Sequence, residues 1–235
     1  MLALIPARGG SKGLPRKNLV DFLGHPLLWW SVDAGCRAQH VARVVVSTDD
    51  DEIAACAREA GAEVPFRRPA ELAGDRVTDL PVFEHALDWL ADEEGYEPDL
   101  VVQLRPTSPL RPDGLVDEGI ERLAADPEAD SLRAVCEPAN NPFKMWRLEG
   151  TYLTPLVELD VPEPYNQPRQ ALPRAYWQIG TLDVIRRRTI TEDHSMSGRN
   201  ILPMILPPSL AVDIDDERSL RHAEQAARDL GLLQR

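Results

Sequence analysis

A cluster of cations and glycines lies close to the start of the 235-residue chain. Residues 5–18 read Ile-Pro-Ala-Arg-Gly-Gly-Ser-Lys-Gly-Leu-Pro-Arg-Lys-Asn. Glycines allow backbone N–H groups to approach phosphate oxygens, and the Arg and Lys side chains supply the opposite charge. The spacing fits neither a Walker A loop nor a Gly-x-Gly-x-x-Gly dinucleotide turn. The loop therefore predicts a phosphate-binding site of another class, because a simple reversal of the chain would not explain its four cations.

The charge of this loop contrasts with that of the rest of the chain. The net charge is −13, yet the first 20 residues contain four cations and no acid, so the other 215 residues carry −17. An acidic body of this kind excludes nucleic acid, or an anionic membrane surface, as a partner held by bulk electrostatics. A small, highly charged anion bound by the local cations remains the expected ligand.

Cellular location is also suggested by composition. The apolar runs fall far short of the roughly 20 residues that span a bilayer. The first six residues lack the basic segment of a signal peptide, so no secretory signal is expected. Three cysteines, odd in number and without metal-ligand spacing, are typical of free thiols. These features together favour a cytoplasmic protein.

Apolar runs alternate with helical periodicity along most of the chain. Strands are predicted at 2–6, 43–48, 63–66, 99–104, 131–136, 176–185 and 201–206, and helices at 26–38, 51–60, 80–90, 113–125 and 217–230. This alternation predicts one domain over 1–235, a three-layer α/β/α Rossmann-like fold with a mostly parallel sheet. Residues 138–175 contain seven prolines and lack a clear period. We expect them to form a functional excursion or a dimerisation arm.

Two carboxylates alternate with apolar residues near the C-terminal end. Asp213 and Asp215 flank Ile214, so in an extended segment both project to the same side. Two such carboxylates repel each other unless a cation lies between them, and Mg²⁺ prefers carboxylate and phosphate oxygens. The acidic run is equally typical of a helix start. The residues by themselves leave both interpretations open.

The run Arg-Pro-Thr-Ser-Pro-Leu-Arg at 105–111 follows the strand predicted at 99–104. Open α/β sheets bind ligands at the carboxyl ends of their strands, so this run lies where a substrate would bind. Its two prolines are interpreted as structural and as a rigid shelf that presents Thr107 and Ser108.

Together these motifs resemble the signature of the acylneuraminate cytidylyltransferases, which make CMP-activated sialic acids and related nonulosonates. The similarity covers nearly the whole chain and depends on the order and spacing of several motifs. They are the loop 5–18, Arg68-Pro-Ala-Glu-Leu-Ala-Gly-Asp75, the run 105–111, Pro168-Arg-Gln-Ala-Leu-Pro173 and Val212-Asp-Ile-Asp215. The resemblance implies a fold of the nucleotide-diphospho-sugar transferase type and a homodimer.

The resemblance also implies roles for individual residues. CTP is expected on the basic loop, at Ala7, Arg8, Gly9, Ser11, Lys12, Lys17 and Asn18. Mg²⁺ is expected on Asp213 and Asp215, which favours the metal interpretation of that segment. The candidate catalytic residues are therefore Arg8, Lys12, Asp213 and Asp215. The acceptor or the phosphates are expected to contact Arg68, Arg105, Lys144, Arg169 and Gln170. In such enzymes the region that holds Lys144 and Arg169 reaches towards the active site of the partner subunit.

The reaction that follows is transfer of CMP from CTP to the anomeric hydroxyl of a nonulosonic acid, with release of pyrophosphate. Two positions depart from the sialic acid pattern: Arg105 replaces the usual Gln, and Gln178-Ile179 replaces an Asn-Gly-Ala-type sequence. The acceptor is therefore open among sialic acid, a Kdo-like sugar, legionaminate, pseudaminate and a phosphorylated compound that would meet the extra cation. A preference for CTP over GTP is likewise open. A catalytically silent nucleotide-binding homologue is the alternative from another class, and the retention of Asp213 and Asp215 disfavours it.

Overall fold

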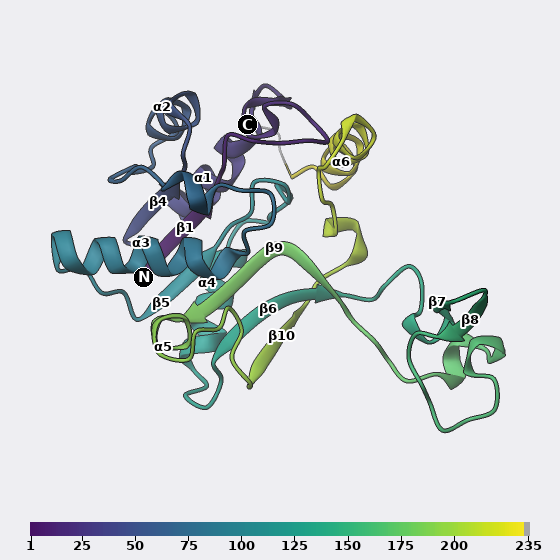
Figure 1. Cartoon of the computed structure of the whole chain (residues 1–235). Helices are drawn as coiled ribbons and strands as arrows, with labels where there is room; N and C mark the ends of the chain where they lie inside the picture. The colour runs from purple at the N-terminus through teal and green to yellow at the C-terminus, as the bar shows by residue number, and fades with distance from the viewer. Residues whose placement is uncertain (233–235) are drawn as a thin grey trace.

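A six-stranded sheet forms the centre of the computed structural model, which describes residues 1–232 (Figure 1). Its strands are β1 (Leu2–Pro6), β4 (Arg43–Ser47), β5 (Leu100–Gln103), β6 (Ser131–Cys136), β9 (Trp177–Arg186) and β10 (Ile201–Ile205). They lie in the order β10-β6-β9-β5-β1-β4. β9 is antiparallel to both of its neighbours, β5 and β6, and the remaining pairs are parallel. The expected mostly parallel sheet is thus confirmed.

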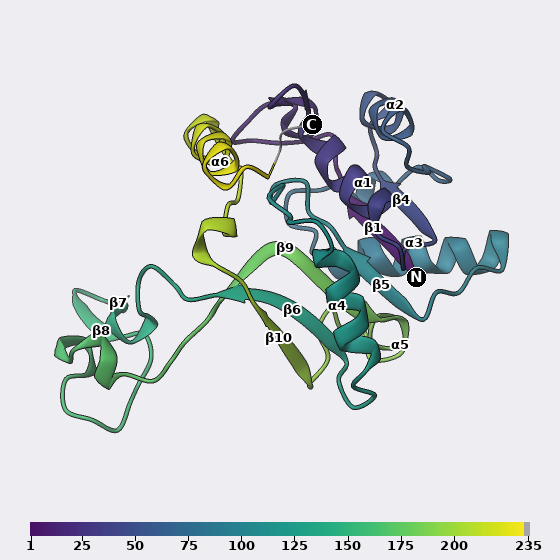
Figure 2. The ribbon, with the colours of Figure 1, turned by 180° about the vertical axis from the view of Figure 1, so that it is seen from behind.

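Helices cover both faces of the sheet, as the two opposite views show (Figures 1 and 2). One face carries α1 (Leu27–Arg37), α2 (Asp51–Glu59) and α4 (Leu115–Ala124), and the other carries α3 (Asp79–Glu94) and the short α5 (Arg187–Thr191). Parallel strands between two helical layers bury both of their faces. In β1, Ala3 and Ile5 pack with α1 and α2, whereas Leu2 and Leu4 pack with α3. The three-layer prediction is confirmed.

The C-terminal helix α6 (Glu217–Leu230) lies beside the N-terminal loop rather than on the sheet (Figure 1). Its Ala223 and Ala227 pack in one apolar cluster with Phe22 and Trp30. Phe22 belongs to a two-stranded ribbon, β2 (Asp21–Phe22) and β3 (His25–Pro26), that the sequence analysis did not predict. This packing brings the N-terminal loop 5–18 close to the segment 212–215 that precedes α6.

Most predicted elements coincide with the observed ones, but the strand expected at 63–66 is wrong. The segment forms a single bridge between Glu63 and Val45, through Glu63 N–H to Val44 O at 2.8 Å and Val46 N–H to Glu63 O at 2.9 Å. Pro65 lies two residues after Glu63 and has no N–H to continue the ladder. Phe66 packs in the apolar cluster between α3 and the sheet.

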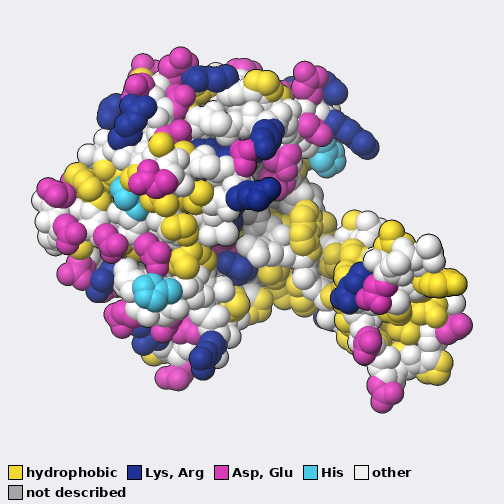
Figure 3. Space-filling model, viewed as in Figure 1, with side chains coloured by type: hydrophobic (Ala, Val, Ile, Leu, Met, Phe, Trp, Pro, Cys, Tyr) yellow, Lys and Arg dark blue, Asp and Glu magenta, His cyan; other side chains and the backbone are white. Residues whose placement is uncertain are grey.

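The proline-rich excursion is an arm that stands apart from the body (Figures 1 and 3). It contains a hairpin of β7 (Trp146–Glu149) and β8 (Tyr152–Pro155), which the sequence analysis did not predict. Short 3₁₀ turns occur in the arm and elsewhere, at Lys17–Leu19, Ala70–Leu72, Pro142–Lys144, Pro164–Asn166, Arg169–Ala171 and Pro208–Leu210. Apolar side chains of the hairpin face solvent: Leu148 is 69%, Tyr152 79% and Leu153 60% exposed.

Across residues 1–232, every helix is too short or too polar to cross a membrane.

Candidate active site

A polar cleft of about 260 Å³ opens at the carboxyl ends of β1 and β5. This is the edge at which open α/β sheets bind ligands. Its lining includes the predicted site residues Arg8, Ser11, Lys17, Asn18, Arg68 and Arg105. Thr107, Asp75 and Asp79 also line the cleft. The structure therefore brings the basic loop and the start of the run 105–111 into one site.

The basic loop is held in place by its own backbone. Ala7 N–H donates to Ser47 O at 3.0 Å, and Gly9 N–H donates to Asp49 Oδ1 at 2.9 Å. These two groups are therefore already paired, and Ala7 lies beneath the cleft rather than in its wall. The N–H groups of Gly10 and Ser11 donate to no other group among residues 1–232. Both residues line the cleft, where these N–H groups can bind phosphate oxygens.

Two of the loop cations share one carboxylate. Arg8 Nη1 lies 2.9 Å from Asp75 Oδ1, and Lys12 Nζ pairs with the other oxygen of Asp75. The hydrogen bond from Lys12 is the main cause that holds the pKa of Asp75 below its usual value. Asn18 Nδ2 donates to Arg8 O at 3.0 Å and so fixes the turn from inside. Arg8 and Asp75 line the cleft, whereas Lys12 does not and is held beside it by its ion pair with Asp75.

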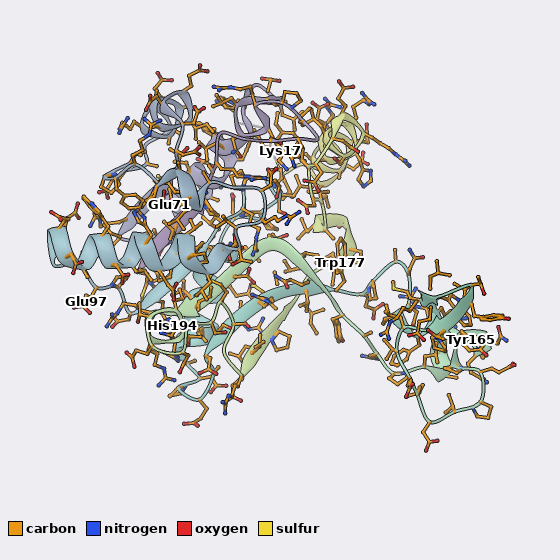
Figure 4. The ribbon with its side chains drawn as sticks, viewed as in Figure 1. Lys17, Glu71, Glu97, Tyr165, Trp177 and His194 are labelled. Atoms are coloured by element: carbon orange, nitrogen blue, oxygen red, sulfur yellow. The ribbon has the colours of Figure 1, made fainter. Side chains whose placement is uncertain are left out.

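The other two loop cations point in different directions. Arg16 pairs with Asp50 and Glu52 at the start of α2 and does not line the cleft. Lys17 Nζ lies 2.7 Å from Asp215 Oδ1, at the junction between the loop and α6 (Figure 4). Lys17 therefore connects the phosphate side of the cleft with the segment that contains the paired aspartates.

The paired aspartates lie as their alternation predicts. Val212 and Ile214 are buried, whereas Asp213 and Asp215 are exposed on the opposite side. Ile214 N–H donates to Thr107 O at 2.8 Å, which places this segment against the wall of the cleft. Although Asp213 is exposed as a residue, the surrounding protein partly desolvates its carboxyl group and so raises its pKa; repulsion from Asp215 also raises that pKa, while a hydrogen bond with Thr107 lowers it. The two carboxylates on one side repel each other, and a bound divalent cation would relieve this repulsion.

The helix-start interpretation applies to the next residue instead. Asp216 is the N-cap of α6, and its carboxylate accepts the Ser219 N–H at 2.7 Å. Ser219 Oγ in return accepts the Asp216 N–H at 2.9 Å, which completes a capping box. Asp213 and Asp215 lie outside the helix, and neither carboxylate caps it.

Arg68 and Arg105, both expected to contact the acceptor, line the cleft but are held by the protein itself. Arg68 is 4% exposed, and its Nε donates to Ser47 Oγ at 3.0 Å. Burial lowers the pKa of Arg68 to about 10. Arg105 Nη1 lies 2.7 Å from Asp183 and Arg105 Nη2 lies 2.9 Å from Asp79. Neither guanidinium is a freely available cation.

The remaining predicted residues are not part of the cleft within one chain. Arg169 and Gln170 line a separate cavity of about 320 Å³ near the base of the arm, and Arg169 Nη2 donates to Pro138 O at 3.0 Å. Lys144 is exposed at the end of a 3₁₀ turn in the arm. β9 begins at Trp177, where the chain returns from the arm and enters the sheet (Figure 4). These three residues and the cleft are therefore not assembled by a single copy of the chain.

Several polar residues in the cleft wall or directly behind it were not predicted from the sequence. Asp75 ends the motif at 68–75 but was given no role, and Asp79 immediately precedes the helix predicted at 80–90 and was given none either. Asp183 and Arg133 lie within strands of mostly apolar residues. A single acid inside such a strand is the signal that could have been used, because a buried charge requires a partner.

Comparison with known proteins decides the family. Residues 2–156, well over half of the chain, match the family model described as cytidylyltransferase. The chain belongs to the cytidylyltransferase family. This cytidylyltransferase is therefore a nucleotidyltransferase, as the motifs predicted.

Curated relatives align over almost the entire chain. The cytidylyltransferase is 29% identical to a pseudaminic acid cytidylyltransferase from Campylobacter jejuni, over 95% of this chain and 94% of that protein. It is also 29% identical to a CMP-N,N'-diacetyllegionaminic acid synthase from the same species, over 95% and 93% of the two chains. An N-acylneuraminate cytidylyltransferase from Escherichia coli is 29% identical over 92% of this chain and 49% of that protein.

Solved structures support the same fold. A CMP:2-keto-3-deoxy-manno-octonic acid synthetase complexed with CTP matches with a TM-score of 0.70 and 19% identity, over 97% of this chain and 98% of that one. A 4-diphosphocytidyl-2C-methyl-D-erythritol synthase from Anaerococcus prevotii matches with a TM-score of 0.65 and 11% identity, over 97% of each chain. The cytidylyltransferase therefore shares the architecture of these enzymes.

Proposed function

We propose that this cytidylyltransferase transfers CMP from CTP to the anomeric hydroxyl of a nonulosonic acid and releases pyrophosphate. The observation that carries the proposal is the cleft at the ends of β1 and β5. It combines a glycine-rich cationic loop for a triphosphate with the run that begins at Arg105, where the acceptor would bind. The names of the three relatives described above refer to pseudaminic acid, N,N'-diacetyllegionaminic acid and N-acylneuraminate, and they support this class of acceptor.

The basic loop is proposed to hold the triphosphate. Arg8, Lys12 and Lys17 would each contribute a charge-assisted hydrogen bond to phosphate oxygens, and the N–H groups of Gly10 and Ser11 would add two more donors. Transfer of a nucleotidyl group depends mainly on positioning and on stabilisation of developing charge. The cations of the loop supply both because the leaving pyrophosphate remains bound to them.

Asp213 and Asp215 are proposed to bind Mg²⁺. The donor set fits this ion: two exposed carboxylates project to one side, and their neighbour Asp216 is already used as a helix cap. Among residues 1–232 no cluster of three or more His, Cys, Asp and Glu offers a more complete cage. Mg²⁺ commonly binds through one or two carboxylates and completes its shell with phosphate oxygens and water. When bound, the ion supplies a Lewis acid that lowers the pKa of a coordinated hydroxyl.

The remaining part of the proposal is a homodimer in the cytoplasm. The exposed apolar hairpin of the arm supports an interface with a second copy, and a partner's arm could deliver Lys144, Arg169 and Gln170 to the cleft. Three free cysteines are compatible with a reducing compartment. Sedimentation velocity is expected to show a dimer, and Tyr152→Glu is expected to shift it towards monomer.

A mixing experiment tests the contribution of the partner. Arg169→Ala and Asp213→Asn each remove activity in their own homodimers if the proposal is right. Mixed dimers contain one cleft with both defects and one with neither, so activity should return when the two variants are exchanged. Two inactive parents that stay inactive after verified exchange would show that Arg169 does not act across the dimer.

The acceptor is tested by a panel. The purified chain is incubated with CTP, Mg²⁺ and one of N-acetylneuraminate, legionaminate, pseudaminate or Kdo, and pyrophosphate release is measured. We expect turnover with at least one nonulosonic acid and formation of the corresponding CMP-sugar. Release with none of these acceptors, together with tight CTP binding by calorimetry, would identify a silent nucleotide-binding homologue instead.

A further inference from the structure

A buried aspartate connects two arginines beside the cleft. Asp183, which is 1% exposed, accepts a hydrogen bond from Arg105 Nη1 at 2.7 Å and another from Arg133 Nε at 2.9 Å. The first reaches Oδ2 and the second reaches Oδ1, so each oxygen is paired with a different guanidinium. Arg105 lines the cleft and Arg133 does not. Asp183 therefore links the cleft wall to a second cation behind it.

The register of the sheet explains this arrangement. Asp183 of β9 lies opposite Gln103 of β5 on one side and opposite Arg133 of β6 on the other. Residues on one rung of a sheet point to the same face, which here is the face covered by α3. The first residue of α3, Asp79, joins them: its Oδ2 accepts from Gln103 Nε2 at 2.8 Å and from Arg105 Nη2 at 2.9 Å.

The charges of this network cancel. Arg105 and Arg133 contribute two positive charges, and Asp79 and Asp183 contribute two negative ones. Burial lowers the pKa of Arg105, but the carboxylates of Asp183 and Asp79 outweigh it and hold that pKa above its usual value. Within this network of four residues Arg105 thus stays protonated and its charge is balanced. A guanidinium has five N–H donors, and the two ion pairs leave some of them for a ligand.

We propose that Asp183 is a positioning residue that fixes the guanidinium of Arg105 and neutralises its charge. This end of the cleft then binds an uncharged oxygen of the acceptor, such as a hydroxyl or an amide carbonyl, and discriminates against a phosphate group. The inference rests on the proposed function, since it names the chemistry of that acceptor. The inference also argues against a phosphorylated acceptor, because a phosphate group would require an arginine whose charge is not already paired.

Two variants change the charge of the network in opposite directions. Asp183→Asn keeps the shape of the side chain and leaves one excess positive charge, whereas Arg133→Gln leaves one excess negative charge. Both break the same Asp183–Arg133 ion pair, so damage to packing would be common to them. The double variant Asp183→Asn with Arg133→Gln restores neutrality. Circular dichroism and thermal melting are recorded for all three variants to establish that they are folded.

The kinetic readout compares an accepted sugar acid with its phosphorylated counterpart at saturating CTP. For Asp183→Asn we expect the acceptor KM to rise about tenfold with a smaller change in kcat, and the kcat/KM ratio to shift towards the phosphorylated compound by about tenfold. Arg133→Gln should not shift the ratio in that direction, and the double variant should return it to the wild-type value. An equal shift in both single variants would reveal a general packing defect and overturn the proposal.

A binding readout stands apart from turnover. Inorganic phosphate is titrated calorimetrically into each variant with CTP already bound, so that the basic loop is occupied. We expect Asp183→Asn to bind phosphate at least about fivefold more tightly than wild type, and Arg105→Gln in that background to abolish the gain. If no acceptor reacts, the proposed function fails and this titration alone decides the role of Asp183. A folded Asp183→Asn variant without any gain in phosphate affinity would overturn the inference.

Discussion

Lys17 Nζ lies 2.7 Å from Asp215 Oδ1, although 198 residues separate the two in the sequence. A second contact reinforces this junction, because a Cβ added at Gly13 would lie 2.3 Å from Asp215 O. The basic loop and the segment of paired aspartates therefore touch through both a side chain and the backbone. The phosphate side and the proposed metal side of the cleft are positioned as one unit.

Gly13 should not tolerate a side chain. In Gly13→Ala the new methyl group meets a backbone carbonyl that cannot move without displacing Asp215, so we expect CTP affinity to fall by at least about tenfold. The thermal midpoint should also decrease. Gly10→Ala is the matched control, since a Cβ at Gly10 has no described atom within 4 Å, and its thermal midpoint should stay close to that of wild type. Equal effects in the two variants would contradict the importance of the close contact.

The two aspartates proposed to bind Mg²⁺ should be distinguishable from their neighbour. Asp213→Asn removes one carboxylate from the exposed pair, and we expect pyrophosphate release to fall by about 100-fold or more even at saturating Mg²⁺. Asp216→Asn removes the same charge nearby but retains a side chain that caps helices well, so its activity should remain near wild type. Near-normal release by Asp213→Asn would show that the metal assignment is wrong.

CTP affinity should depend on Mg²⁺ and on salt. Outside the first 20 residues the chain carries −17, so the triphosphate needs the loop cations and a divalent ion to approach the cleft. Chelation with EDTA is expected to weaken CTP binding by about tenfold or more, and added salt should weaken it further by screening the exposed cations. Isothermal calorimetry measures both effects. An affinity unchanged by both treatments would contradict the electrostatic account.

Asp75 should compete with the triphosphate for Arg8 and Lys12. In Asp75→Asn both cations lose their carboxylate partner, and we expect CTP to bind several-fold more tightly, by about threefold to tenfold. Asp51→Asn is the matched control, because it removes an exposed charge that is paired with Arg67 outside the cleft. Weaker CTP binding by Asp75→Asn alone would mean that Asp75 contacts the ligand itself.

Asp130 should make stability depend on pH. Its Oδ2 accepts the N–H groups of Asn200 and Arg199, both at 2.9 Å, and these bonds hold the pKa of Asp130 below its usual value. Because the folded state has the lower pKa, the stabilisation is present above the unfolded-state pKa of about 4 and is lost as the pH falls. Asp130→Asn should lower the free energy of unfolding by about 1 kcal/mol at neutral pH, with a smaller difference in acid.

Urea unfolding at several pH values measures the effect at Asp130. Asp193→Asn is a suitable control, since its exposed carboxylate makes no hydrogen bond or ion pair with any residue in the described part of the chain. A difference between wild type and Asp130→Asn that stays constant from neutral to acid pH would contradict the assigned role.

The elements that the sequence predicted well are those whose signals are local. The apolar run of β1 and the Asp50 cap of α2 are each complete within a few neighbouring residues. The antiparallel direction of β9 has no such local signal. This strand follows the arm instead of a helical crossover, so the nearby sequence does not indicate its orientation in the sheet. The strand expected at 63–66 failed for a related reason: its apolar pattern was correct, but pairing ended where Pro65 interrupts the donors.

The sequence by itself predicted the class of ligand and the residues proposed to bind it. The glycines and cations of residues 5–18 and the alternation of Asp213 with Asp215 depend only on residue type and spacing. Only the tertiary structure decided that Arg105 is neutralised, because its partners Asp79 and Asp183 lie 26 and 78 residues away and meet it through sheet register and the start of a helix. The same long-range packing separated the Asp216 cap from the exposed pair and placed Arg169 outside the cleft of its own chain.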